Sequence, residues 1–200
     1  MRKLITTISG ILTTAVVGTA IATPAAAQGG VELTPWAGAY LPTNNSFSTS
    51  TDNFKRDVSV IGGARLSFWG TSHLGFEVTG GYAPAKVAGE TINETKTNLL
   101  VANARLLLAL TPVTSGVGVF VGGGGALLTR GKNTFDNDKS STDLGATLGL
   151  GFRFGGGNDV GFRLDIEDYM YNGDFGGGNS FQNDLVTSVG VSIPLGGKAD

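Results

Sequence analysis

The stretch Leu144–Glu167, LGATLGLGFRFGGGNDVGFRLDIE, decides the fold. Apolar residues occupy its even positions on both sides of a Gly-rich turn at 155–159, and this strict period of two is typical of β-strands with one apolar face. The odd positions hold Arg153, Arg163, Asp165 and Glu167 among small residues. The stretch therefore predicts a hairpin with one wholly apolar face and one charged face.

Two fold classes are compatible with such a hairpin. A soluble sheet buries its apolar face in a core and leaves its charges in water. A membrane barrel has the opposite arrangement, with apolar side chains facing lipid and charged side chains facing the lumen. The remainder of the chain has to distinguish the two classes.

Composition limits the possible functions. The chain has 200 residues, 33 glycines, no cysteine and a formal net charge of −2, which suits one domain without disulfides. We expect no nucleic-acid partner, because no basic patch or aromatic stacking motif is present. We also expect no cofactor and no metal site. Charged residues make up 15% of the chain, below the roughly 25% of an average soluble domain.

The first 27 residues have the pattern of a secretory signal peptide. Arg2 and Lys3 give a positive start, an apolar stretch follows, and Ala25–Ala27 supplies a cleavage site of small residues. We expect residues 1–27 to be removed and residues 28–200 to form the mature domain. That remainder contains no apolar helix long enough to span a bilayer, so it could enter a membrane as a closed barrel.

Apolar and polar residues alternate in six further segments, as they do in the opening hairpin. They are Val31–Leu41, Val58–Trp69, Leu74–Ala83, Thr97–Leu110, Val117–Leu128 and Asp184–Leu195. Pro35 cannot donate to a ladder, so we expect a bulge or weak pairing there. In Val117–Leu128 the alternation is ambiguous, because Val117 and Val121 suggest one face while Phe120 and Leu128 suggest the other.

Strand length and connection length favour a membrane barrel. Ten residues tilted by about 40° reach about 26 Å, which matches an apolar band of about 25 Å. Short turns alternate with long polar connections, as in an up-and-down barrel with its long loops outside the cell. The predicted long loops are Pro42–Asp57, Pro84–Lys96, Arg130–Ser141 and Asn172–Asn183.

All charges within the predicted strands except Asp168 share the polar parity, which places them in a lumen. We expect lumen ion pairs among Arg65, Glu77, Arg105, Asp143, Arg153, Arg163, Asp165 and Glu167. A tight turn sets Arg65 opposite or nearly opposite Glu77, and the other arginines are expected to pair with Asp143, Asp165 and Glu167. Asp168 breaks the parity, and we expect it beside the fourth loop, where a charge costs least.

The chain resembles the outer-membrane β-barrel family of OmpA-like and opacity-like proteins. The resemblance rests on VELTPWAGAYLP at 31–42, GLGFRFGGGNDVGFRLDIEDY at 149–169 and LVTSVGVSIPLGG at 185–197. It implies an all-β fold, an eight-stranded antiparallel up-and-down transmembrane barrel in a bacterial outer membrane. It also implies contact with outer-membrane lipid and lipopolysaccharide, and assembly by the barrel-insertion machinery.

The expected function is structural or adhesive, through four long external loops that meet a surface partner, with a closed, salt-bridged lumen and no enzyme activity. Three alternatives remain: a small pore, a lipid-modifying enzyme, and a soluble lipocalin-like barrel that binds a ligand. An enzyme could use His73 as a base beside Ser72. Asp165 and Glu167 could act as an acid/base pair, but arginine partners favour a structural role.

Overall fold

The structure is a computed structural model that describes residues 30–43, 46–48, 53–56, 58–89, 95–131, 141–155, 159–174 and 179–195. The predicted signal peptide, residues 1–27, lies outside the described residues. No helix among the described residues is long and apolar enough to cross a membrane.

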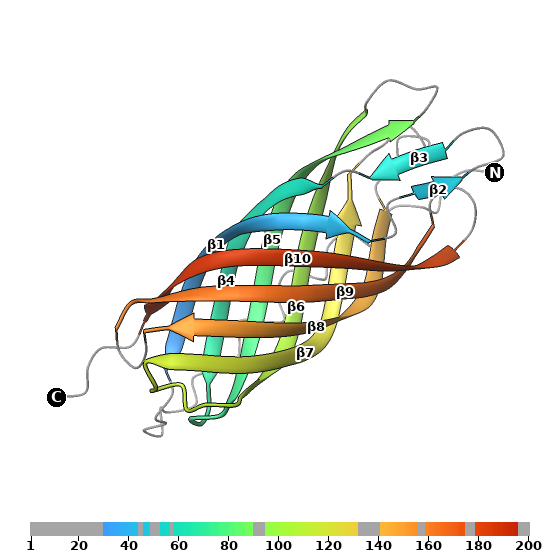
Figure 1. Ribbon diagram of the computed structural model, residues 1–200. Helices are drawn as coiled ribbons and strands as arrows, with labels where there is room; N and C mark the ends of the chain where they lie inside the picture. Colours follow the sequence, from blue (N-terminus) through green and yellow to red (C-terminus); the bar gives the residue numbers. More distant parts are fainter. Residues whose placement is uncertain are drawn as a thin grey trace, which may run out of the picture.

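The described residues form ten β-strands, eight of which close into a barrel (Figure 1). The barrel strands are β1 (Val31–Pro42), β4 (Ser59–Trp69), β5 (Leu74–Gly89), β6 (Thr95–Ala109), β7 (Val117–Arg130), β8 (Ser141–Phe154), β9 (Gly161–Asp174) and β10 (Asn179–Pro194). Each strand pairs antiparallel with its chain neighbour, and β1 pairs with β10 to close the ring. The predicted eight-stranded antiparallel barrel is therefore confirmed.

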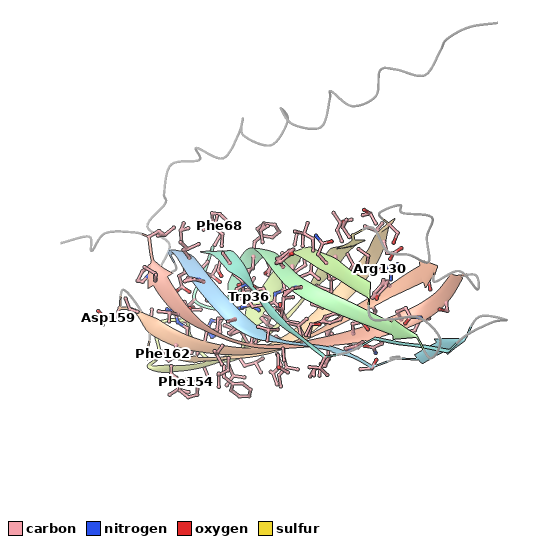
Figure 2. The ribbon with its side chains drawn as sticks, turned by 90° about the horizontal axis from the view of Figure 1, so that it is seen from above. Trp36, Phe68, Arg130, Phe154, Asp159 and Phe162 are labelled. Atoms are coloured by element: carbon pink, nitrogen blue, oxygen red, sulfur yellow. The ribbon has the colours of Figure 1, made fainter. Side chains whose placement is uncertain are left out.

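Apolar side chains cover the outside of the barrel. Leu144 is 77% exposed and Val60 is 72% exposed, whereas charged residues of opposite parity such as Arg65, Glu77 and Arg163 are buried. Figure 2 shows Phe68, Phe154 and Phe162 pointing away from the barrel and Trp36 within it. Lipid favours this orientation. The hydrocarbon around the barrel holds no water, so the polar side chains find their hydrogen-bond partners inside the barrel. It contradicts the soluble lipocalin-like alternative.

Two ambiguities of the sequence are resolved by the register. In β7 the even positions face the lumen, so Phe120 and Leu128 are buried inside while Val117 is exposed outside. The β1–β10 register has no pair at Thr34 or Pro35, although the same register continues on both sides. The expected weak pairing at Pro35 is confirmed, and it occurs without a bulge.

The strands on the side of the long connections, called here the upper end, reach farther than predicted. β5 continues to Gly89 and β10 begins at Asn179, so most of the predicted loops Pro84–Lys96 and Asn172–Asn183 is strand. The predicted loop Pro42–Asp57 contains a small hairpin, β2 (Ser46–Ser48) and β3 (Asn53–Arg56), which pairs with the upper part of β5. The prediction ended each strand where apolar alternation ended, but the backbone ladder continues past the lipid band.

A ring of polar residues marks the top of the apolar band. Its members occupy the outward parity near the upper ends of six strands: Thr43, Asn98, Thr129, Thr142, Asn172 and Asn183. Below this ring the outward positions are almost all apolar. The upper strand ends therefore stand above the hydrocarbon.

Glycines on the inner face make room for large side chains. A Cβ on Gly151 would lie 2.0 Å from the Phe120 ring, and one on Gly81 would lie 2.7 Å from Trp36. A Cβ on Gly149 would lie 2.5 Å from Arg105 Nη1. The interior is thus filled by aromatic rings as well as by the arginines that the sequence predicted there.

Gly151→Ala should destabilise the barrel by about 1–3 kcal/mol, because the added methyl group overpacks the interior against the rigid Phe120 ring. The matched control is Gly125→Ala on β7, where a Cβ meets nothing within 4 Å. Urea unfolding of both variants in lipid vesicles measures the difference. Equal midpoints for the two variants would contradict the packing argument.

Candidate functional site

Six charged side chains meet across the middle of the lumen. We call Arg65, Glu77, Arg105, Arg163, Asp165 and Glu167 the central charge cluster. They come from β4, β5, β6 and β9, and each residue is at most 3% exposed. Because β9 lies across the barrel from β5 in the strand order, the cluster spans the whole cross-section.

Glu77 is the centre of the cluster, because all three arginines approach it. Its Oε1 accepts hydrogen bonds from Arg105 Nη2 at 2.7 Å and from Arg163 Nη2 at 3.1 Å, and Arg65 Nε lies 3.9 Å away. Its Oε2 accepts from Arg163 Nη1 and, at 2.6 Å, from the hydroxyl of Ser67. The register sets Glu77 opposite Ser67 and Arg65 opposite Thr79, so Arg65 and Glu77 are diagonal neighbours on the inner face, in agreement with the predicted near-opposition.

The two carboxylates of β9 are held in the same way. Arg163 bonds Asp165 with two nitrogens, each at 2.8 Å. Glu167 lies 2.8 Å from Arg65 Nη2 and 2.7 Å from Arg105 Nη1. Such charge-assisted contacts are stronger than neutral hydrogen bonds, and they leave neither carboxylate placed as a solvent-facing acid or base.

Aromatic and aliphatic layers enclose the cluster on both sides. The Arg65 guanidinium lies 4.5 Å from the Trp36 ring, and that of Arg163 lies 4.4 Å from the Phe120 ring. Trp36 belongs to an upper layer with Tyr40, Ile61, Ala83, Leu99, Val101, Ala126, Leu128, Tyr169, Tyr171 and Val186. Phe120 belongs to a lower layer with Trp69, Leu107, Ala109 and Val113. The sequence analysis did not identify these layers.

Arg153 and Asp143 have lumen parity, as predicted, but they lie outside the cluster and pair with residues other than those predicted. Arg153 Nη2 lies 2.7 Å from Glu32 Oε1 near the lower end, whereas Asp143 pairs with Arg130 near the upper end. Ten residues of β8 separate the two, which is about 34 Å along a strand. Period-two parity identifies the face of a residue but not its height, so it could not separate them.

A tyrosine–carboxylate group lies inside the upper part of the barrel. Tyr171 Oη donates to Asp184 Oδ2 at 2.6 Å, and Tyr40 Oη donates to the same oxygen. Below it, the Asn103 amide donates to Tyr169 Oη at 2.7 Å. All of these residues have lumen parity. Polar and aromatic residues at inward positions were therefore the sequence feature from which this group could have been predicted.

His73 lies in the exposed turn between β4 and β5, at the lower end. Its Nδ1 is 2.9 Å from Ser72 Oγ. Within the described ranges no carboxylate is bonded to His73, and no group of three or more His, Cys, Asp or Glu side chains could hold a metal ion. The contact between Ser72 and His73 is thus an isolated pair on a turn.

Comparison with known proteins agrees with this geometry. The profile of the outer membrane protein β-barrel domain family matches residues 12–192. No curated protein sequence matches the chain. Three solved bacterial barrels share the fold, each covering 82–83% of this chain and 96–99% of its own length.

These structures differ widely from this chain in sequence. Neisserial surface protein A is 13% identical to this chain, with a TM-score of 0.62. OprG of Pseudomonas aeruginosa is 15% identical, with a TM-score of 0.60. The N-terminal barrel domain of Pseudomonas aeruginosa OprF is 14% identical, with a TM-score of 0.51. At such identities the likeness establishes the fold alone.

Arg163→Leu should lower the free energy of unfolding by about 3–5 kcal/mol, because it leaves buried carboxylates without their donors. The double variant Arg163→Leu/Asp165→Leu should lose no more unfolding free energy than the single variant, because it also removes one of the carboxylates left without a partner. Urea unfolding in vesicles measures both. A loss of less than about 1 kcal/mol in the single variant would mean that the cluster contributes as little as a surface ion pair.

Proposed function

Because this chain belongs to the outer membrane protein β-barrel domain family, and so to the outer membrane, we propose that it is a closed, non-conducting barrel with a structural or adhesive role. Its interior acts as a solid core, and its interactions with the cell's surroundings take place at the upper end. This proposal differs from a small pore, which would need a continuous water path.

The burial of the central charge cluster carries the proposal. Arg65, Arg105 and Glu77 are each at most 1% exposed although they face the lumen, so they present almost no surface to water at their height in the barrel. An eight-stranded barrel is just wide enough for side chains to fill. The apolar layers above and below the cluster support the same conclusion.

The upper end supports the adhesive part of the proposal. The β2–β3 hairpin extends the sheet from the upper part of β5 (Figure 1), and β10 places Phe181, 60% exposed, above the polar ring. Exposed strand ends and loops on a rigid barrel are suitable for recognition, because the scaffold fixes their positions. A partner at the cell surface would meet this end of the molecule.

The partners proposed within the membrane follow from the outside of the barrel. Its apolar band favours outer-membrane lipid, with lipopolysaccharide in the outer leaflet, and the closed β1–β10 seam requires an assembly step of the kind that the barrel-insertion machinery performs. We propose no enzyme activity, because Ser72 and His73 lack an orienting carboxylate among the described residues. Lipid hydrolysis that is lost in His73→Ala would contradict this assignment.

The refolded protein should give no steady conductance in planar-bilayer recordings. A variant with Glu77, Arg105, Arg163 and Asp165 all replaced by alanine should also give no steady conductance if it folds, because the apolar layers above and below the cluster still fill the lumen. Persistent open steps in the unmodified protein would overturn the closed-barrel proposal.

Replacing residues 46–56 by a short Gly-Ser linker should abolish binding of expressing cells to a host-cell or abiotic surface, while the barrel still shifts in gel mobility on boiling. The control carries Ser72→Gly and His73→Gly in a turn at the opposite end, and its binding should be unchanged. Equal binding by both variants would exclude the hairpin as the contact element.

A further inference from the structure

A layer of neutral polar side chains lies directly above the central charge cluster. Thr79 on β5 and Asn103 on β6 each lie two residues above a member of the cluster on the same strand. The register sets Thr79 directly opposite Asn103 and, farther around the ring, Thr147 on β8 directly opposite Tyr169 on β9. All four residues have lumen parity, and each is at most 4% exposed.

Three oxygen atoms of this layer have no hydrogen-bond partner among the described residues. They are Thr79 Oγ1, Asn103 Oδ1 and Thr147 Oγ1. The nitrogen of the Asn103 amide is used, because Nδ2 donates to Tyr169 Oη at 2.7 Å, and this bond holds the amide close to the cross-strand pair of Tyr169 and Thr147. A buried polar atom without a partner is costly, so three of them in one layer point to a ligand that bonds them.

The wall between Asn103 and Thr147 carries little side-chain volume. β7 lies between β6 and β8. Its lumen positions at this height are Ala126, directly opposite Asn103, and Gly124, directly opposite Thr147. Because a methyl group is the largest side chain on this part of β7, the layer has room for a small polar molecule beside the amide and the hydroxyl.

We propose that the barrel binds ordered water in this layer, between the Asn103 amide and the hydroxyl groups of Thr79 and Thr147. Asn103 Oδ1 can only accept a hydrogen bond, whereas each threonine hydroxyl can donate one and accept others. Water matches this set, because it donates to the amide oxygen and accepts from a hydroxyl at the same time. Buried water in proteins typically makes about three such bonds to groups that have no other partner.

An ion or a larger solute is a poorer occupant of this layer. The three oxygen atoms belong to neutral side chains, and the described strands hold no group of three or more His, Cys, Asp or Glu side chains that could bind a metal ion. The upper apolar layer and the charge cluster enclose the site from above and below. The proposal goes beyond the proposed function, because a closed barrel can be dry or hold water here, and conductance tests the closure alone.

Thr147→Val keeps the shape of the side chain and removes its hydroxyl group. It should lower the folding equilibrium constant of the full mature barrel in phospholipid vesicles about tenfold, because the bound water loses a partner, and Thr79→Val should act in the same direction. Urea unfolding measures the change, and a mobility shift on boiling verifies that each variant is folded. The matched control is Thr187→Val at an outward position of β10, where a methyl group facing lipid should cause no loss.

In a dry layer the Thr147 hydroxyl would stay unpaired, and valine would leave the folding equilibrium constant unchanged or raise it. That result would overturn the proposal. A crystal structure of the unmodified mature barrel separates bound water from a direct contact between side chains. We expect density for water within hydrogen-bond distance of Asn103 Oδ1. A threonine hydroxyl bonded directly to that oxygen, with no water beside it, would also overturn the proposal, even if both valine variants were destabilised.

Discussion

The neutralisation of charge across the middle of the lumen is the constraint on which the rest of this structure depends. A barrel in lipid turns its polar face inward, and eight strands leave no room for water to solvate the charges gathered there. Three arginines and three carboxylates balance one another at Glu77 and along β9. Removing either the arginines or the carboxylates would leave buried charges without partners, so the charged residues of four strands depend on one another.

The layers around that cluster explain how an interior lined by polar side chains can be closely packed. Trp36 and Phe120 place ring faces against two of the guanidinium groups, which supplies partners to cations without adding further charges. Inward glycines such as Gly81 and Gly151 admit those rings. The interior therefore stabilises the wall and leaves recognition to the upper end, where the strands rise above the lipid.

Most of the fold could be predicted from the sequence, because parity alone assigns every residue of a regular strand to one face. Parity carries no information about height, and this is why Arg153 and Asp143 were placed with partners that they do not have. It also does not reveal that Trp36, Ile61 and Phe120, on the charged face, form apolar layers within it. The small hairpin above β5 has no apolar alternation to predict it, because it lies outside the hydrocarbon.

The missing backbone pairs at Thr34 and Pro35 bear on the order in which the molecule comes together. Seven of the eight joins in the ring link strands that follow one another along the chain, so each can form soon after its two strands exist. The eighth joins residues about as far apart as the described chain allows, such as Thr34 and Ser192, and must wait for the last strand. It is also the join whose ladder is interrupted at a proline, so the last connection to form is the one in which a side-chain hydrogen bond stands in for missing backbone pairs.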